Sequence, residues 1–373
     1  MQIVATGIIN TGERGTSRAV GTFPTTTALV DGSILATYRI GTDKDSADAT
    51  VELRRSTDGG RSWSAPEQPF STDFDGMKGS LRCGYVTVLG GSHLILAGMW
   101  VDRTTYPGQP IFNEETEGCL PTKLLLSESE DGGRSWSPFR HASIAADVGP
   151  PSLTNPILRL RSGRLVLSIE SNKQYHDTSP WMQRVVYIYS EDGGRSWGEA
   201  VTVCQDPSGR IFNWDQRAGV ATDGRLATFT WTYDSETTRY LNIHRRISGT
   251  EGDSWTAAED LGFADQASVP AMLPDGRVLL VWVDRFGSQS IRARVAPAVD
   301  APFPPETEVE LYRLGTAAVT VAGEGDTGEL LNEMGAWSYG LPHAEVLPDG
   351  DVLVVYYAGE DDRMDVCWVR LAP

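Results

Sequence analysis

Short apolar runs recur along the chain in pairs, and each pair is separated by a two-residue turn that ends in glycine. Residues 27–30, for example, precede the turn Asp31-Gly32, and residues 33–36 follow it. Apolar runs of this length around a tight turn are typical of a β-hairpin. The turn glycines are Gly32, Gly91, Gly163, Gly224, Gly276 and Gly350, at intervals of 59, 72, 61, 52 and 74 residues. The pattern therefore predicts six hairpins spread over the whole chain.

A second repeat consists of nearly identical eight-residue segments. They read STDGGRSW (56–63), SEDGGRSW (129–136), SEDGGRSW (190–197) and, in a degenerate copy, SGTEGDSW (248–255). The aspartate and serine side chains can bond nearby backbone N–H groups, the glycines allow positive φ, and the tryptophan can pack between sheets. These features predict a structural turn, so the repeated Asp58, Asp131 and Asp192 are not catalytic candidates.

Together the repeats predict the fold. About 60 residues with four strands make one blade of a β-propeller. We expect an all-β protein, a six-bladed β-propeller with four-stranded antiparallel blades, in a single domain that spans residues 1–373. Residues 2–9 form a strand-like run that no hairpin uses. This N-terminal strand is predicted to close the ring as the outermost strand of the last blade, which would remove an exposed sheet edge.

Composition narrows the possible partners. Apolar residues make up 40% and charged residues 22% of the 373 residues, which is enough for a globular core. The net charge of −18 argues against nucleic acids and anionic membranes, whose phosphates favour clustered cations. The oligomeric state is left open.

Cysteine spacing and the first residues bear on the compartment. The four cysteines show no paired spacing typical of zinc sites and are expected to be free thiols. The first residues lack the basic and long apolar regions of a signal peptide, and no apolar run is long enough for a bilayer. The expected location is cytoplasmic, although a secreted protein with its leader removed would read the same.

Equivalent positions of a propeller gather at one end of the ring, so the candidate site can be located from the strand register. The starts of the innermost strands and the ends of the second strands are expected at the mouth opposite the turns. These positions are rich in arginine, carboxylate and aromatic side chains, which suit sugar rings and sugar carboxylates. The predicted substrate-binding residues are Arg39, Arg82, Arg103, Glu170, Arg217, Trp231, Asp284 and Arg285.

The eight-residue repeat resembles the Asp box, or BNR repeat, of the sialidase superfamily, and the resemblance covers essentially the full length. It implies a propeller that acts on a sugar through three arginines, a tyrosine nucleophile with an assisting glutamate, and a loop aspartate as acid/base. Thr22 stands where the first of these arginines is normally found, and another arginine position falls near Trp231. The loss of the first arginine favours a related sugar hydrolase over a true sialidase.

The leading hypothesis is a glycoside hydrolase that acts on an acidic or polar sugar. The resemblance implies Asp45 as the loop acid, with Asp48 as its competitor, and places Asp215 near the position of the assisting glutamate. Tyr339, shifted by about two positions, resembles the nucleophile. Such a reaction needs an acid to protonate the leaving oxygen and a nucleophile or base opposite it, so Asp215 or Tyr339 is the expected partner of Asp45.

Two alternatives remain open. A polysaccharide lyase acting on uronic acid would need a base such as His343, His176 or Tyr339, with arginines as clamps on the carboxylate. A non-catalytic propeller for binding or assembly would have a mouth without converging acid and base groups. No cofactor and no metal in the site is expected, because residues 43–48 are too irregular for an EF-hand and no glycine-rich phosphate loop opens a helix. Whether loop carboxylates hold a single structural calcium ion is left open.

Overall fold

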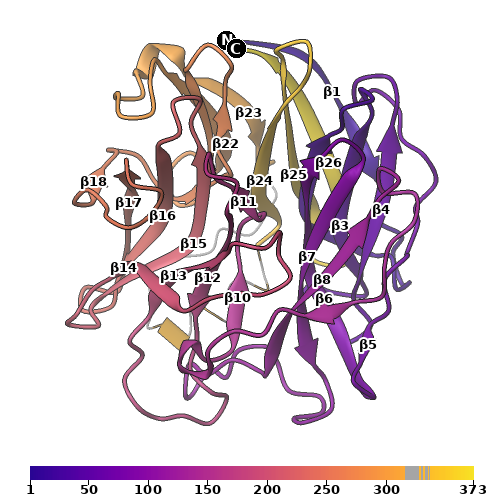
Figure 1. Cartoon of the computed structure of the whole chain (residues 1–373), viewed down its shortest axis with the longest axis vertical. Coiled ribbons are helices and arrows are strands. Elements are labelled where there is room, and N and C mark those ends of the chain that lie inside the picture. The colour runs from indigo at the N-terminus through magenta and orange to yellow at the C-terminus, as the bar shows by residue number, and fades with distance from the viewer. Residues whose placement is uncertain (316–326, 329–330, 332–334, 336) are drawn as a thin grey trace.

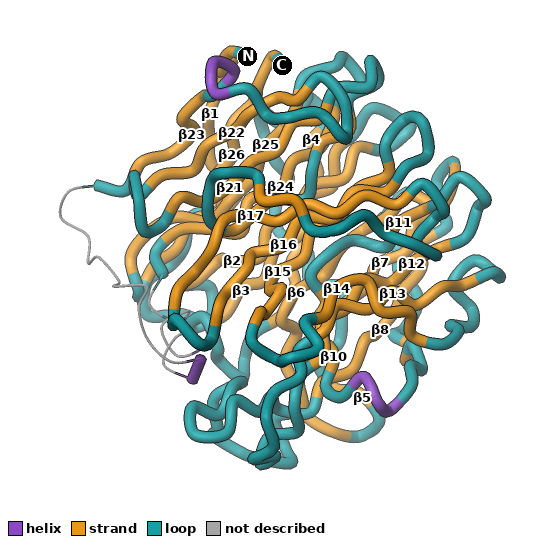
Figure 2. The backbone as a smooth tube through the Cα atoms, turned by 90° about the vertical axis from the view of Figure 1, so that its left-hand side faces the viewer, coloured by secondary structure: helices purple, strands orange, loops and turns teal. Residues whose placement is uncertain are grey.

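The computed structural model describes residues 1–315, 327, 328, 331, 335 and 337–373, and it is an all-β protein (Figure 1). Its strands are arranged as in a β-propeller, and loops cover both ends of the sheets (Figure 2). Helical structure in the described residues is limited to short turns, which include the 3₁₀ segments Ala146–Val148 and Pro305–Thr307. No described helix is long and apolar enough to cross a membrane.

The strands of the described residues form five hydrogen-bonded sheets. The first sheet has seven strands and contains β24 (Tyr339–Val346), β25 (Val352–Glu360), β26 (Arg363–Ala372), β1 (Gln2–Asn10), β2 (Val20–Ala28), β3 (Ile34–Gly41) and β4 (Thr50–Ser56). The second contains β5 (Asp73–Phe74), β6 (Met77–Gly90), β7 (His93–Asp102), β8 (Thr122–Ser129) and β9 (Arg140–His141). Blades of four strands were predicted, whereas the hydrogen-bonded sheets have four, five or seven strands.

The other three sheets follow in chain order. The third contains β10 (Pro151–Leu153), β11 (Leu158–Arg159), β12 (Leu165–Ser171), β13 (Arg184–Ser190) and β14 (Ala200–Gln205). The fourth contains β15 (Ile211–Val220), β16 (Leu226–Asp234), β17 (Arg239–Ser248) and β18 (Glu259–Asp260). The fifth contains β19 (Gln266–Ala267), β20 (Ala271–Met272), β21 (Val278–Asp284), β22 (Ser290–Ala296) and β23 (Val309–Arg313).

The predicted hairpins are confirmed at all six turns. Strands β2 and β3, for example, pair antiparallel around Gly32, and β24 and β25 pair around Gly350. Five of the six turn glycines have φ between 83° and 93°, which a residue with a Cβ adopts only with strain. The glycine at each turn is therefore required by the backbone and fixes the register of the strands on either side.

The predicted closure by the N-terminal strand is also confirmed. Strand β1 runs antiparallel to β26, with Gln2 opposite Ala372 and Ile8 opposite Cys367, and the two chain ends lie side by side (Figure 1). A single parallel pair, Val20 with Met364, links this group of strands to β2, β3 and β4. The pair explains why hydrogen bonding joins the first and last groups of strands into one sheet.

The repeated eight-residue segments form one kind of turn. Asp58 Oδ1 accepts the N–H of Ser62 at 2.9 Å and Oδ2 accepts its hydroxyl at 2.6 Å, while Ser56 donates to Oδ1 at 2.8 Å. Hydrogen bonds, those from Ser62 above all, lower the pKa of Asp58 to about 2. Asp131 and Asp192 make the same bonds. All three aspartates are committed to their own turns, as expected for a structural role.

The core lies between neighbouring sheets. One cluster joins Ile95 and Ala97 of β7 to Leu167 and Ile169 of β12, and all four side chains are fully buried. The four cysteines are free, and Cys83, Cys119 and Cys204 are buried in this kind of packing. Desolvation raises the pKa of each thiol, so these groups behave as small apolar side chains.

Candidate functional site

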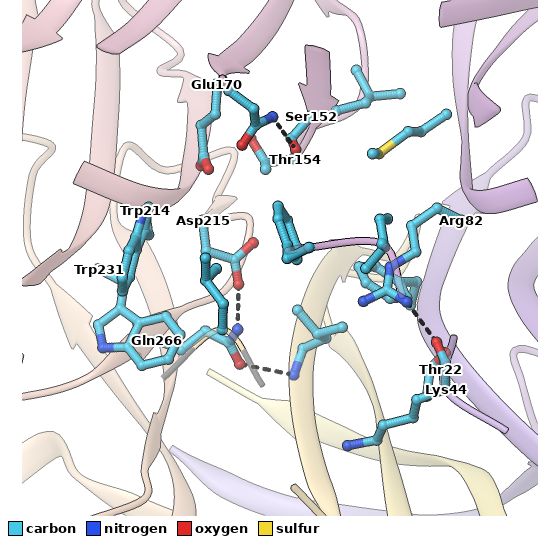
Figure 3. Close-up of a pocket in the computed structure, with 18 of the residues that line it drawn as sticks. Thr22, Lys44, Arg82, Ser152, Thr154, Glu170, Trp214, Asp215, Trp231 and Gln266 are labelled. Carbon is cyan, nitrogen blue, oxygen red and sulfur yellow. Dashed lines mark hydrogen bonds between the residues drawn. The ribbon is translucent and has the colours of Figure 1, made fainter. Parts of the chain in front are cut away.

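An open cavity of about 940 Å³, measured out to bulk solvent, lies where the inner strands of the sheets meet (Figure 3). Six strands each contribute at least one residue to the lining. These contributors are Thr22 of β2, Arg82 of β6, Leu153 of β10, Asp215 of β15, Gln266 of β19 and Leu341 of β24. A cavity lined from every inner strand lies on the shared axis of the sheets, where the sequence placed the mouth.

A repeated backbone irregularity turns side chains into this cavity. Register shifts interrupt β2, β6, β15 and β24 at Phe23, Arg82, Asp215 and Leu341. Each of these residues stands nine positions before the turn glycine of its hairpin, as Phe23 does before Gly32. Phe23, Asp215 and Leu341 have φ of 51°, 48° and 48°. A β-bulge redirects a side chain in this way, and strained bulges are common next to active sites.

Two carboxyl groups, Glu170 and Asp215, point into the same side of the cavity (Figure 3). Glu170 is the next-to-last residue of β12 and is only 7% exposed, and its Oε1 accepts the N–H of Gln216 at 2.8 Å. Burial, together with the negative charge of Asp215, raises the pKa of Glu170 to about 8. Glu170 is therefore a neutral acid at pH 7 beside a second carboxyl group.

Asp215 is held by groups that suit a carboxylate. Arg217 Nη2 donates to its Oδ1 at 2.7 Å, and the side-chain amide of Gln266 donates to its Oδ2. Arg217 is itself fixed by a hydrogen bond to the carbonyl of Thr154. When two neighbouring carboxyl groups lie in different electrostatic environments, one can act as the acid and the other as the base or nucleophile.

Two basic residues, Arg82 and Lys44, lie across the cavity from the carboxyl pair (Figure 3). Arg82 donates to the carbonyl of Lys44 and lies 4.9 Å from the ring centroid of Phe23. The Lys44 ammonium donates to the carbonyl of Trp337 and lies 3.3 Å from the hydroxyl of Tyr357. Burial, and then the nearby charges of Arg285 and Arg82, lower the pKa of Lys44 well below its usual value. The cavity therefore has an acidic and a basic side.

Aromatic side chains form a large part of the wall. Four tryptophans from different elements contribute, namely Trp181, Trp214, Trp231 and Trp337. Trp214 stacks on Tyr233 with ring centroids 5.1 Å apart, and Trp231 stacks on Tyr240 at 4.4 Å. Rings fixed by stacking offer rigid faces to the apolar side of a sugar ring.

Of the residues selected from the sequence, four line the cavity together: Arg82, Glu170, Asp215 and Trp231. Arg217 lies behind Asp215 and holds it. Arg39 does not line the cavity; it is buried near Arg82, it bonds Ser46 at 3.3 Å, and burial lowers its pKa to about 9.

Asp45 and Arg103 form an ion pair that holds two loops together, and neither residue lines the cavity. Asp45 Oδ1 accepts from Arg103 at 2.8 Å, and its Oδ2 accepts the N–H of Ile111 at 2.7 Å. Arg103 also bonds Ser80 at 2.9 Å. Both carboxylate oxygens of Asp45 are thus used to anchor the loop that carries Ile111. Asp45 does not line the cavity, although its Oδ1 lies 4.0 Å from Nη1 of Arg82, which does.

Tyr339 and His343 do not line this cavity, although the sequence-based site included them. The Tyr339 ring packs in the core beside Tyr312, with ring centroids 5.4 Å apart. The register shift after Gly340 places Leu341 at the cavity instead. His343 lies further along β24 and lines a separate cavity between the inner strands. Burial lowers the pKa of His343 to about 3, so its imidazole is neutral there.

Asp284 and Arg285 also lie outside the cavity. Asp284 caps its own turn by accepting the N–H groups of Gly287 and Ser288 at 3.0 and 2.9 Å. Arg285 lies 3.9 Å from the ring centroid of Trp337 and pairs with the buried Asp265 at 3.4 Å. It supports the aromatic wall from behind.

Sequence reasoning selected no role for several lining residues, among them Lys44, Trp181, Trp214, Gln266 and Tyr357. Gln266 and Tyr357 stand at the strand ends that the register assigns to the mouth, so that signal was present. Trp214 directly precedes Asp215, and neighbours in a regular strand face opposite ways; only the bulge lets both reach the cavity. Lys44 and Trp181 lie on loops, where strand register gives no information.

No family model matches the chain, but one curated protein and several solved structures are similar to it. A sialidase from Micromonospora viridifaciens is 28% identical over 214 residues, which are 52% of this chain and 31% of that protein. The chain therefore matches about a third of the length of this curated relative.

Solved structures extend the similarity to nearly the whole chain. A Dyadobacter fermentans protein of unknown function superposes with a TM-score of 0.73 at 20% identity, over 99% of this chain and 98% of its own. The intramolecular trans-sialidase of Ruminococcus gnavus gives 0.66 at 14% identity, over 97% and 96%. The leech intramolecular trans-sialidase gives 0.65 at 13% identity, over 99% and 70%. The resemblance to the sialidase superfamily is thus confirmed in sequence and in fold.

Proposed function

We propose that this protein is a glycoside hydrolase of sialidase-like type, which cleaves the bond to an acidic or polar sugar held in the cavity. The observation that carries the proposal is the Glu170–Asp215 pair. One member has its pKa raised to about 8 and the other is paired with Arg217 at 2.7 Å. A neutral acid beside a charged carboxylate matches the two roles that glycoside hydrolysis requires.

In this mechanism Glu170 donates its proton to the glycosidic oxygen as the bond breaks. Asp215 stabilises the positive charge that develops on the sugar ring, as a nucleophile or as a base toward water. Arg82 and Lys44 bind an anionic or polar substituent on the far side of the ring. The tryptophan faces pack on the apolar face of the sugar and keep bulk water from the reacting bond.

We also infer six blades for the propeller. The seven-stranded sheet divides at its one linking pair, Val20 with Met364, into two groups of strands. Each group has an inner strand that lines the cavity, since β2 contributes Thr22 and β24 contributes Leu341. Six groups, each with one inner strand, match the six turns in the sequence.

The two alternatives have less support. A lyase was expected to use His343, His176 or Tyr339 as the base, and none of the three lines the cavity. A binding propeller would not need an acid and a carboxylate directed at one cavity, as Glu170 and Asp215 are. Lyase chemistry would still be recognised in an assay, because it creates a C=C bond that absorbs in the ultraviolet.

The test is a panel of acidic and neutral aryl glycosides and the corresponding oligosaccharides. The wild-type protein is expected to release at least one sugar, and Glu170→Gln and Asp215→Asn are each expected to lower kcat by about 10²- to 10⁴-fold. Asp284→Asn is the matched control, because Asp284 also ends a second strand but caps a turn outside the cavity. Full activity of both site variants would contradict the proposal.

A further inference from the structure

A second cavity lies between the same inner strands, nearer to the hairpin turns. Its volume is about 990 Å³, measured out to bulk solvent. We call it the turn-end cavity, and it is lined by residues 26–28, 86–88, 155–158, 218–220, 269–272 and 343–346. These residues follow the bulges along the strands, as Thr26 follows Phe23 and His343 follows Leu341. None of them lines the cavity that holds Glu170.

Among its described residues, the turn-end cavity has two ionisable side chains, His343 and Glu345, and no lysine or arginine. The two are separated by one residue in the regular part of β24, so they lie on one face of that strand. Nε2 of His343 lies 3.1 Å from the carbonyl oxygen of Thr26, and Oε1 of Glu345 accepts the N–H of Ala28 at 2.8 Å. Both side chains therefore reach β2, the neighbouring inner strand.

The bond to Thr26 determines which nitrogen of His343 is open. A carbonyl oxygen only accepts, so Nε2 carries the proton and donates it. Burial lowers the pKa of His343 to about 3, so the ring is neutral and Nδ1 keeps its lone pair. His343 is only 5% exposed, and its Nδ1 is buried and bonds no described group. A metal-binding histidine is oriented in this way, with one N–H on a backbone carbonyl and the other nitrogen toward the ion.

Two oxygen donors lie on the same wall of the turn-end cavity. The hydroxyl oxygen of Thr26 is buried and bonds no described group. The carboxyl group of Glu345 has its pKa raised to about 7 by burial, and only the bond from Ala28 opposes this effect. Buried acceptors that lack a donor are unfavourable. A single cation would satisfy the nitrogen and both oxygen donors, and it would keep Glu345 ionised.

We propose that the turn-end cavity is a structural site for one divalent metal ion of the zinc type. The ligands are Nδ1 of His343, the carboxylate of Glu345 and the hydroxyl of Thr26, and water completes the coordination. Imidazole together with carboxylate suits Zn²⁺, whereas Ca²⁺ prefers oxygen ligands alone.

The position of the site gives the ion a role in closing the ring. Strand β2 belongs to the first group of strands and β24 to the last, and one backbone pair, Val20 with Met364, links these groups within their sheet. An ion held by His343 and Glu345 of β24 and by Thr26 of β2 joins the two groups at the axis. The site does not depend on the proposed hydrolysis, which uses the other cavity.

A cluster on the surface offers ligands for the same ion and has to be removed in the test. One ligand atom each of His93, Glu128 and Glu130 lies within 4.8 Å of the others. Arg140 donates to Glu128 at 2.8 Å, so a guanidinium group already compensates part of this negative charge. The variant His93→Ala removes the cluster without touching the turn-end cavity, and it serves as the parent protein.

The binding test titrates Zn²⁺ into the full chain after treatment with EDTA and dialysis, with calorimetry as the readout. The parent is expected to bind one Zn²⁺ per chain and to gain several degrees in Tm. Adding Glu345→Gln or His343→Gln should weaken binding by about tenfold or more and abolish the gain in Tm. The glutamine at position 343 can still donate an N–H to the carbonyl of Thr26, so it removes only the ligand nitrogen.

Three results would overturn the site. They are no binding of Zn²⁺ by the parent, equal binding by the parent and both cavity variants, and binding of Ca²⁺ as tight as that of Zn²⁺. A measurement on the parent alone does not depend on whether the variants fold. Crystals of the parent soaked in Zn²⁺ and measured at the zinc absorption edge should show an anomalous peak between His343 and Glu345, and peaks found only elsewhere would contradict the proposal.

Discussion

Arg217 donates a hydrogen bond of 2.7 Å to Asp215, two residues before it in the same strand. In a regular strand these side chains would lie on one face at fixed spacing. Here the bulge between Trp214 and Arg217 turns Asp215 into the cavity, while Arg217 stays buried behind it and bonds Thr154. The arginine thus fixes the direction of Asp215 and supplies its counter-charge, and the charge of Asp215 in turn helps keep Glu170 protonated.

The first prediction is a basic limit to catalysis near pH 8. Glu170 acts as an acid only while protonated, and its pKa is raised to about 8, so kcat should fall as the pH rises through that value. Glu170→Gln should remove this limb and cost more with a poor leaving group than with nitrophenol, which needs little protonation. The measurement is kcat against pH for both substrates. A basic limb that persists in the glutamine variant would assign it to another group.

The second prediction concerns the charge of the substrate. Arg82→Gln should raise KM for an acidic sugar by about 10- to 100-fold, because a hydrogen bond to a charged group contributes about 1.5–3 kcal/mol. Neutral glycosides of the same leaving group serve as the internal control and should be little affected. An equal loss with both kinds of sugar would mean that Arg82 supports the cavity wall without contacting the substituent.

The third prediction concerns thermal stability. It replaces the aspartate of a complete repeat, Asp58, by threonine, and the threonine of the degenerate repeat, Thr250, by aspartate. Asp58 accepts three hydrogen bonds through two oxygens, whereas Thr250 has a single oxygen, which accepts the N–H of Ser254 at 2.9 Å. Asp58→Thr should lower Tm, and Thr250→Asp should raise it, when measured by calorimetry at pH 7.

The pH dependence gives this exchange a control. The folded-state pKa of Asp58, about 2, lies below its ordinary value of 3.8. The stability that its charge provides is therefore present above about pH 4 and lost as the pH falls toward 2. The difference in Tm between wild type and Asp58→Thr should shrink over that range. A constant difference would indicate that backbone strain, not the carboxylate, is responsible.

The fourth prediction concerns Glu345. This residue lines the separate cavity between the inner strands that also contains His343, and it accepts the N–H of Ala28 at 2.8 Å. Burial raises its pKa from 4.5 to about 7. Its contribution to stability is therefore full below about pH 4.5 and is lost as the pH rises through 7. Glu345→Gln cannot ionise but keeps the acceptor. Its Tm relative to wild type should increase between pH 5 and pH 8, and a flat difference would contradict the assignment.

The site shows where reasoning from sequence succeeds and where it stops. Strand register placed Arg82, Glu170 and Asp215 at the mouth, because positions at a fixed distance from a turn glycine recur in every hairpin. The same register could not reveal that a bulge points Leu341 into the cavity and leaves Tyr339 in the core. One inserted residue reverses the facing of a side chain, and nothing local in the sequence marks the insertion.

The sequence by itself determined the hairpins, the repeated aspartate turns and the closure by the first strand. The hairpins and the aspartate turns depend on contacts within a few residues and on glycines with positive φ. The closure was predicted from a strand-like run that no hairpin uses, although its partner β26 lies at the other end of the chain. Only the tertiary structure decided which charged groups do chemistry and which hold the frame. Asp45, for example, is anchored by Arg103 and Ile111, which the sequence places far from it. The pKa of Glu170 likewise depends on burial and on Asp215 in another sheet, and such long-range terms arise only when the sheets come together.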